Sequence, residues 1–428
     1  MHRYFVRLPE MRSNSHRASI LGWRAAVVLA AIFIACSPAP ATTQPASEQP
    51  VQPTEKPSQA TSPVAPSQES SEGQIIFHSD SNGGSDFYLT LSPALRSGAS
   101  AGVNADSSGL VRLTENANTE PFPTVSPDGQ WIAFSTKDTR DIFVLNLAEA
   151  LQDPGGARPI NLTQSASREA EPAWSPDSRR LAFVSYDDGL IYVVDLPEAG
   201  RTATPPVPQA LAQGFEPDWS PDGKRIAFFS DRDGNAEIYV VPAPGPHAQV
   251  NADGSEQTRL TNDPAADYTP RWSPDGRQIL FVSERDGNAE IYEMPAPGPQ
   301  AQVNADGSGQ MNVSNDRAHD EFAFWSPDST RILYVSYQDG ADPFSIGEGN
   351  AEIFVVNADG TGKTNLTDND VWNGDPGWSP DGKRIVFTRR EGPDRQGHIY
   401  VMNADGSDPI WLLGEPGAWN DCCAVWQP

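Results

Sequence analysis

Acidic residues recur in this chain a few positions before a repeated tryptophan. Aligned on that tryptophan, at least one acid precedes every copy: Glu120, Glu171, Glu216, Asp267, Asp320, Glu321, Asp375 and Asp421. Aromatic residues accompany them, at Phe215, Tyr268, Phe322, Trp372 and Trp419. A ring of carboxylates around a water-filled channel mouth concentrates cations or a basic peptide. These acids and Tyr268 are therefore the candidate ligand-binding residues. The alternative is a wet mouth lined with polar side chains for solubility alone.

A calcium site is the second chemistry to consider. The run Asp231-Arg232-Asp233-Gly234-Asn235 and its partial copy Arg285-Asp286-Gly287-Asn288 resemble the start of a calcium loop. Both lack the remaining ligands of an EF-hand, including its distal bidentate glutamate. Asp-Gly-Asn is also a strong hairpin signal, which favours a turn. Calcium stays open as a cofactor, and the sequence indicates no other.

Catalytic motifs give little support for an enzyme. No His-Glu-x-x-His zinc motif occurs, and no glycine-rich phosphate loop. The four histidines beyond the leader, His78, His247, His319 and His398, occupy unlike repeat positions. General acid–base catalysis needs two carboxyls with separated pKa values, and a ring of similar acids predicts no such asymmetry.

The elements that must position these acids come from an internal repeat. Ser-Pro-Asp-Gly or Ser-Pro-Asp-Ser begins at Ser126, Ser175, Ser220, Ser273, Ser326 and Ser379, with spacings of 49, 45, 53, 53 and 53 residues. Such a period indicates one supersecondary unit copied and stacked. In the copy from Phe215, short apolar runs alternate with the turns Ser-Pro-Asp-Gly, Asp-Gly-Asn and Asn-Ala-Asp-Gly. Each copy therefore predicts four antiparallel strands, and copies around an axis predict an all-β propeller.

The two ends of the repeat region complement each other. Residues 73–80 contain a second strand without the preceding tryptophan and turn, and Ala424–Pro428 resembles a first strand without its continuation. We expect the C-terminal strand to pair with the N-terminal sheet and close the ring, which removes open sheet edges. This predicts seven blades, with six or eight left open by two degraded stretches.

The repeated signature resembles the TolB-like, or WD40-like, family of β-propeller repeats. The matching residues are Trp-Ser-Pro-Asp-Gly, Ile-Ala-Phe, Ser-Asp-Arg-Asp-Gly-Asn-Ala-Glu-Ile-Tyr, Asn-Ala-Asp-Gly and Arg-Leu-Thr. The resemblance implies a propeller over residues 73–428 and, by analogy, an envelope protein that binds other proteins. The family's namesake has six blades, so its partners do not transfer directly.

The N-terminal region predicts export. Residues 1–35 carry five arginines and then the apolar run Ala25–Ala35, which suits a signal peptide. Ala35-Cys36 resembles a bacterial lipobox, which predicts lipidation of Cys36; an ordinary secreted protein is the alternative. Residues 36–72 are rich in proline, serine and threonine, which predicts a disordered tether. The protein is then membrane-anchored and faces the periplasm or the cell exterior.

Charge and cysteine content limit the partners. The net charge is −27, and removing residues 1–35 lowers it to −31. Nucleic acid and anionic headgroups are poor partners for such a surface, whereas cationic partners fit.

Only Cys422 and Cys423 remain beyond Cys36. Two buried thiols are expected there, with a strained vicinal disulfide or a metal contact as alternatives.

These observations predict a monomeric, non-catalytic propeller that binds a protein or peptide at the cell envelope and reaches the membrane through its lipid anchor only. A cationic partner fits the charge of the chain. An envelope enzyme of the hydrolase type, using the channel-mouth carboxylates, is the alternative. A purely structural envelope element is the third reading.

Overall fold

The computed structural model covers most of the predicted propeller domain. It describes residues 73–80, 84–91, 110–115, 117–120, 122–154, 156–197, 206–244, 256–297, 309–338, 350–391, 396–412 and 420–428. The predicted leader (1–35), the tether (36–72) with Cys36, and Trp419 lie outside the described residues. Among the described residues, no helix has the length and apolar character needed to span a membrane.

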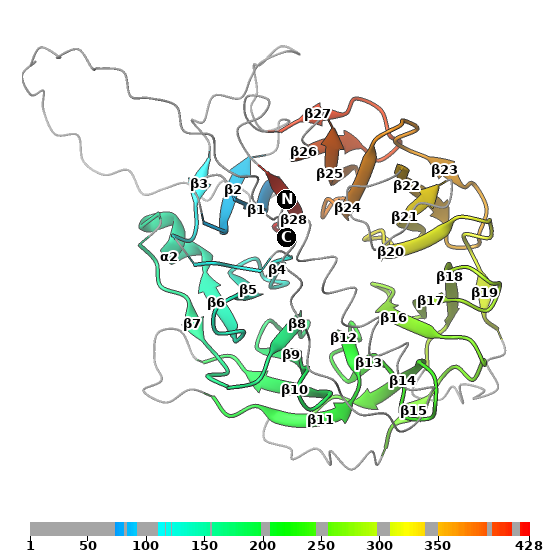
Figure 1. The fold of residues 1–428 in the computed structure, drawn as a ribbon, viewed down its shortest axis with the longest axis horizontal. Helices are drawn as coiled ribbons and strands as arrows, with labels where there is room; N and C mark the ends of the chain where they lie inside the picture. The colour runs from blue at the N-terminus through cyan, green and yellow to red at the C-terminus, as the bar shows by residue number, and fades with distance from the viewer. Residues whose placement is uncertain are drawn as a thin grey trace, which may run out of the picture.

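Seven four-stranded antiparallel sheets surround a central axis (Figure 1). The innermost strands are β28 (Asp421–Trp426), β4 (Thr124–Val125), β8 (Glu169–Trp174), β12 (Phe215–Trp219), β16 (Asp267–Trp272), β20 (His319–Trp325) and β24 (Trp372–Trp378). The second strands are β1 (Gln74–Ser79), β5 (Trp131–Ser135), β9 (Arg180–Ser185), β13 (Arg225–Ser230), β17 (Gln278–Ser283), β21 (Arg331–Gln338) and β25 (Arg384–Glu391). The seven-bladed propeller predicted from the repeats is confirmed. Each blade is named below by its innermost strand.

The outermost strand has only two residues in six of the seven blades. The third strands are β2 (Asp86–Leu91), β6 (Ile142–Asn146), β10 (Leu190–Asp195), β14 (Glu237–Pro242), β18 (Glu290–Pro295), β22 (Asn350–Asn357) and β26 (Gln396–Asn403). The outermost strands are β3 (Val111–Arg112), β7 (Ile160–Asn161), β11 (Gln209–Gln213), β15 (Thr258–Arg259), β19 (Met311–Asn312), β23 (Thr364–Asn365) and β27 (Ile410–Trp411).

The ring closes where the two ends of the chain meet. Strand β28 pairs antiparallel with β1, with Trp426 opposite Ile75. The backbone N–H of Gln427 donates to the carbonyl of Gln74 at 2.9 Å. The side-chain amide of Gln427 donates to the carbonyl of Gly129 in the next blade at 2.7 Å. The predicted closure by the C-terminal strand is therefore confirmed.

The Ser-Pro-Asp-Gly/Ser turns are built by the serine and the aspartate. In the β20 blade the N–H of Ser329 donates to the carbonyl of Ser326 at 2.9 Å, which closes the turn. The Ser326 hydroxyl donates to Asp328 at 2.6 Å. Ser329 has a φ of +60°, the left-handed conformation for which glycine is usually chosen. Its hydroxyl accepts a hydrogen bond from the N–H of Asp275 at 3.1 Å, so the serine variant also links two blades.

The recurrent tryptophan also connects neighbouring blades. The indole N–H of Trp174 donates to the carbonyl of Thr124 at 3.1 Å, and that of Trp219 donates to the carbonyl of Ala173 at 3.2 Å. In the closing blade, Trp426 donates in the same way to Gly377 at 3.2 Å. Each bond runs from an innermost strand to the innermost strand of the preceding blade.

The hydrophobic core lies between blades as well as within them. Within each blade, one aromatic pair faces across the second and third strands: Phe77–Tyr88, Phe134–Phe143, Phe183–Tyr192, Phe228–Tyr239, Phe281–Tyr292, Tyr334–Phe354 and Phe387–Tyr400. Between blades, one buried cluster joins Phe229 and Ile238 to Trp272 and Phe281 of the next blade. No blade encloses its apolar side chains alone.

Two local features differ from the sequence expectation. Helix α2 (Leu147–Gln152) follows β6 and was not predicted; the Asn146 side chain caps it by accepting from the N–H of Glu149 at 3.1 Å. The Asp-Gly-Asn hairpin does join β13 to β14, but Ser230 pairs with Glu237, which leaves a six-residue loop instead of a tight turn.

Removal of the closing tryptophan tests the ring. We expect Trp426→Ala to lower the free energy of unfolding by about 3–5 kcal/mol, the usual cost of truncating a buried aromatic side chain. Ile410→Ala is the control, because Ile410 is 49% exposed on the outermost strand β27. Chemical denaturation monitored by circular dichroism measures both, and equal effects would contradict the closure role of Trp426.

Candidate functional site

Every innermost strand changes its backbone conformation three residues before the recurrent tryptophan or its substitute. There one residue takes a left-handed φ between +49° and +69°: Phe122, Glu171, Glu216, Thr269, Phe322, Asp375 and Cys423. In the blades with longer inner strands, the pairing register shifts at the same place, which marks a β-bulge. These seven are called the bulge residues below.

The bulge residues of neighbouring blades contact each other around the axis. The backbone N–H of Glu216 donates to the Glu171 carboxylate at 2.8 Å. In another part of the ring, the Cys423 thiol lies 3.9 Å from an Asp375 carboxylate oxygen of the preceding blade. Phe122 of the following blade packs against the pair Cys422 and Cys423. A left-handed residue that is not glycine costs roughly 1–3 kcal/mol and persists only where its surroundings determine it. Here the ring of inner strands imposes it at the same position in each blade.

A group of carboxyls occupies one side of this ring. Glu171 accepts hydrogen bonds from the Tyr186 hydroxyl and from the N–H of Glu216. Glu321 accepts from the Tyr268 hydroxyl at 3.2 Å and lies 2.8 Å from the His319 ring. The residues Glu171, Glu216 and Glu321 are called the channel carboxyl group below. They come from the three blades β8, β12 and β20.

Burial dominates the ionisation of this group. It raises the pKa of Glu216 to about 8, and the negative charge of Glu171 adds to the shift, while Arg271 opposes it. Burial also raises the pKa of Glu171, although the Tyr186 hydroxyl and the Glu216 N–H favour its charged form. The Glu216 Oε2 atom is buried without a hydrogen-bond partner among the described residues, whereas Glu171 accepts two bonds. The pair is therefore asymmetric, with the proton favoured on Glu216.

The remaining predicted acids lie elsewhere in the blades. Asp267, Asp320, Asp421 and Glu120 stand five residues before the tryptophan or its substitute, and all four are at least nine-tenths buried. Asp267 forms a bidentate ion pair with Arg285 at 2.9 and 3.0 Å. The eight acids that the sequence grouped in one ring thus separate into three positions, five, four and three residues before the tryptophan or its substitute. Glu171, Glu216 and Asp375 are bulge residues, and Glu321 contacts Tyr268 next to them.

Three residues of the site were missed by sequence reasoning. Arg271 opposes the burial that raises the pKa values of Glu216 and Asp218, and Arg168 opposes the burial that raises the pKa of Glu171. Tyr186 bonds Glu171. Arg271 carried a signal, because no other copy has a basic residue directly before the tryptophan position.

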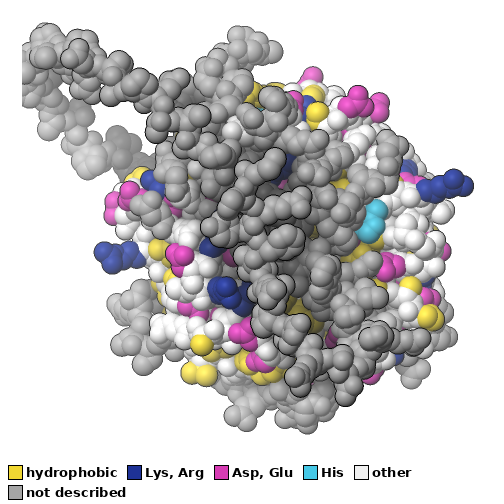
Figure 2. Space-filling view, in the orientation of Figure 1, with side chains coloured by type: hydrophobic (Ala, Val, Ile, Leu, Met, Phe, Trp, Pro, Cys, Tyr) yellow, Lys and Arg dark blue, Asp and Glu magenta, His cyan; other side chains and the backbone are white. Residues whose placement is uncertain are grey.

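The two C-terminal cysteines are buried and form no disulfide. The Cys422 sulfur lies 3.8 Å from Nδ1 of the buried His78, and Cys423 is a bulge residue. This arrangement agrees with the expectation of two buried thiols. Outside the ring, Figure 2 shows acidic, basic and apolar side chains interspersed over the described surface visible on one face.

Comparison with known proteins identifies the type of repeat. Residues 138–318 match the family model of the TolB beta propeller domain. The uncharacterised peptidase YuxL of Bacillus subtilis is 29% identical over 165 residues, which cover 31% of this chain and 24% of that protein. The uncharacterised protein Atu1656 of Agrobacterium fabrum is 30% identical over 146 residues, which cover 33% of this chain and 45% of that protein. The chain therefore spans less than half the length of these relatives.

One solved structure shares the fold over a larger region. A puromycin-hydrolysing peptidase of Mycobacterium tuberculosis superposes with a TM-score of 0.53 at 16% identity, covering 81% of this chain and 52% of that chain. At this identity the likeness shows the fold alone.

The raised pKa of Glu216 predicts a pH-dependent effect on stability. A carboxyl whose pKa is raised from 4.5 to about 8 holds its proton more tightly in the folded state, so its contribution to stability declines as pH rises through that range. We expect Glu216→Gln to raise the melting temperature at pH 9, by about 2 °C or more, and to leave it unchanged at pH 4. Thermal unfolding by circular dichroism measures this.

Asp328→Asn is the control with the opposite sign. Hydrogen bonds from Ser326 and Thr330 lower the pKa of Asp328 to about 2, so its contribution is present above pH 4 and is lost as pH falls toward 2. This variant should be less stable than the wild type at neutral pH only. A Glu216→Gln shift of the same size at pH 4 and pH 9 would rule out the titration.

Proposed function

We propose that this chain, whose residues 138–318 match the TolB beta propeller domain, is a non-catalytic binding module whose channel receives a basic segment of a protein or peptide partner. The binding residues are the channel carboxyl group, with Asp375 on another innermost strand. In this proposal the protein is an exported monomer at the cell envelope, anchored through Cys36.

The observation that carries the proposal is the channel carboxyl group itself. Three carboxyls meet there, with Arg271 as the basic side chain that acts on both Glu171 and Glu216. Burying like charges together is unfavourable unless a positive group neutralises them. A lysine or arginine side chain from a partner would supply that charge, and the Glu216 Oε2 atom has no hydrogen-bond partner among the described residues.

The overall charge supports a cationic partner. The chain has a net charge of −27, and an acidic protein attracts basic partners and repels nucleic acid over long distances. The inner strands hold the carboxyls on a rigid scaffold, so little conformational entropy is lost when a partner binds. The arginine-rich leader and the proline-rich segment before residue 73 support the envelope location.

An enzyme is the second candidate, because the Glu171–Glu216 pair is asymmetric. A carboxyl that keeps its proton near neutral pH beside one that accepts two hydrogen bonds is an arrangement suited to general acid–base chemistry. One relative and one similar structure are peptidases, and both are longer than the matched region. A Gly-x-Ser-x-Gly spacing at Gly98–Gly102 lies outside the described residues.

Loss of the channel carboxyls should abolish binding of a basic probe. We expect Glu171→Gln/Glu216→Gln/Asp375→Asn to weaken binding of octalysine at least about tenfold, a change of 1.4 kcal/mol. Isothermal titration calorimetry measures the affinity. The matched control Glu115→Gln/Glu149→Gln/Asp408→Asn makes the same three types of substitution at exposed positions and should change affinity less than about twofold.

Equal losses in the two triple variants would contradict a channel site. Hydrolysis of peptide or glycan substrates by the wild type, abolished by Glu171→Gln or Glu216→Gln, would favour the enzyme instead. These outcomes separate binding at the channel from non-specific attraction to an acidic protein.

Binding of the probe should also depend on pH through Glu216. A bound cation favours the charged carboxylate, so binding releases the proton that Glu216 holds with a pKa of about 8. Affinity should therefore rise as pH increases from 6 to 9, and Glu216→Gln should flatten the profile. A profile that is flat in the wild type would contradict this proton release.

A further inference from the structure

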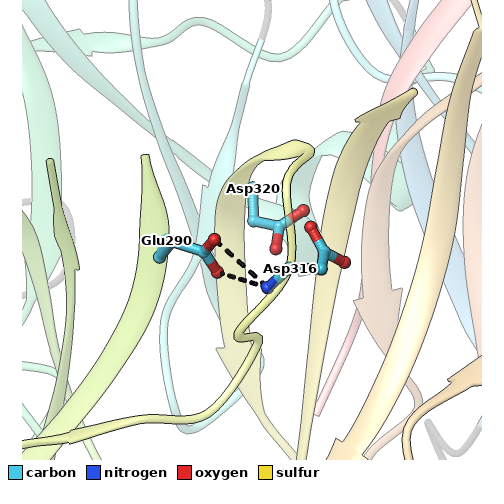
Figure 3. A group of neighbouring side chains, drawn as sticks. All are labelled: Glu290, Asp316 and Asp320. Carbon is cyan, nitrogen blue, oxygen red and sulfur yellow. Dashed lines mark hydrogen bonds between the residues drawn. The ribbon is translucent and has the colours of Figure 1, made fainter. Parts of the chain in front are cut away.

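A second carboxyl cluster lies between the β16 and β20 blades, apart from the channel carboxyl group. Glu290 begins β18, Asp316 lies in the connection to the next blade, and Asp320 belongs to β20. One oxygen from each carboxyl lies within 4.8 Å of the other two. Figure 3 shows the three side chains converging from these separate segments. We propose that Glu290, Asp316 and Asp320 bind a hard divalent metal cation of the calcium class.

The donor set and its size suit such an ion. All three ligands are carboxylate oxygens. Such a set suits calcium, magnesium and manganese better than zinc or copper, which favour nitrogen and sulfur ligands. Calcium binds oxygens at about 2.3–2.6 Å, so two ligands on opposite sides of the ion are up to about 5 Å apart. The three carboxylate oxygens lie within 4.8 Å of one another, which is inside that span. Asp316 is partly exposed, which leaves room for water ligands on that side.

Asp320 has no ion-pair partner of its own among the described residues. Its side chain is completely buried, and neither carboxylate oxygen has a hydrogen-bond partner in the part of the chain that the structure describes. The buried hydroxyl of Tyr334 likewise has no hydrogen-bond partner among the described residues. An ion would satisfy a carboxylate that these residues leave unsatisfied.

The preceding pair of blades shows how the same position is neutralised there. Glu237 and Asp267 stand 53 residues before Glu290 and Asp320. Arg259 forms an ion pair with Glu237 at 2.5 Å, and Arg285 forms one with Asp267 at 2.9 Å.

Both arginines are missing from the proposed site. The residues 53 positions after Arg259 and Arg285 are Asn312 and Gln338. Asn312 donates to Asp286 instead, and Gln338 donates to the Ser336 hydroxyl. The proposed site therefore has the same carboxyls as the preceding pair of blades but neutral amides at the two arginine positions.

The following pair of blades uses another solution. There Asn369 and Asn373 stand 53 residues after Asp316 and Asp320. Asn373 donates to the carbonyl of Val371 at 3.0 Å and accepts from Arg389 at 2.9 Å. Of these three equivalent positions, only the one at Glu290, Asp316 and Asp320 combines three carboxyls with neither arginine.

Lys363 supplies one positive charge at the edge of the cluster. Its ammonium pairs with Asp316, donates to the carbonyl of Ser314 at 2.8 Å, and lies 5.8 and 5.3 Å from the ring centroids of Tyr334 and Phe354. It makes no hydrogen bond to Asp320 or Glu290. One ammonium therefore faces three carboxyls, and a divalent ion would complete the charge balance.

Hydrogen-bond donors around Glu290 fix the orientation of its carboxylate. The Ser314 hydroxyl and the Asn288 amide donate to its two oxygens at 2.6 Å each, and the N–H of Asp316 donates at 3.2 Å (Figure 3). Asn288 belongs to the partial Asp-x-Asp-Gly-Asn copy. Its amide supports a ligand, whereas Asp286 of that turn accepts from Tyr292 and is not part of the cluster.

Calcium titration of the chelator-treated protein tests the site, with magnesium and manganese as parallel probes. We expect binding of one ion by calorimetry and a higher melting temperature with ion than with chelator. Asp320→Asn and Asp316→Asn should each weaken binding at least tenfold. Both changes place asparagine where the next blade carries Asn373 and Asn369, so the fold should tolerate them.

Two further variants set the controls. Asn312→Arg/Gln338→Arg restores the arginines of the preceding blade and should abolish ion binding in a folded protein. Asp263→Asn, at the equivalent of Asp316 in that blade, should leave it unchanged. A folded wild type that binds none of the three ions would overturn the proposal. So would ion binding that survives in both Asp316→Asn and Asp320→Asn.

Discussion

The closed ring is the constraint on which the other features depend. Each blade packs its aromatic and aliphatic side chains against the next, as Phe229 does against the β16 blade. The same neighbours are joined by indole–carbonyl bonds between their innermost strands. Without β28, the edge of β1 would be open and the β24 blade would lose the Trp426 contact, so the apolar surface of the first and last blades would face water. The pairing of the two ends is a long-range contact, but the entropic cost of closing a loop grows only slowly with its length.

The ring places the backbone of every blade in an equivalent position. The blades therefore differ at the bulge position in their side chains and not in their backbone conformation. The bulge position carries phenylalanine in two blades, carboxylates in three, and threonine and cysteine in the others. The backbone adopts the left-handed conformation at this position in each blade. Acids that fall at this position in neighbouring blades lie next to each other, as Glu171 and Glu216 do. In the blades that carry Phe122 and Cys423, the same position contributes to a buried apolar cluster instead.

Much of this architecture could be read from the sequence, because turns and strands repeat with a near-fixed period. The blade number, the Ser-Pro-Asp turns and the closing strand follow from that period. The placement of the acids did not follow. In a regular strand, residues five and three positions before the tryptophan would share a face, because side chains alternate. The bulge breaks this alternation, so Asp267 is buried against Arg285 while Glu216 belongs to the channel carboxyl group. Helix α2 was missed because six residues are too few for a helical period to show.

Three blade interfaces resolve the same electrostatic problem in different ways. A buried carboxylate without a partner is strongly unfavourable, and losing one member of a buried pair typically costs several kcal/mol. Asp267 is compensated by Arg285, and at Asn373 the charge itself has been removed. Among the described residues Asp320 has neither compensation, although its carboxyl is as deeply buried as that of Asp267. Its neighbour Glu321 belongs to the channel carboxyl group, and alternation along β20 places the two on opposite faces of one strand. The interface between the blades and the channel carboxyl group therefore share the strand β20.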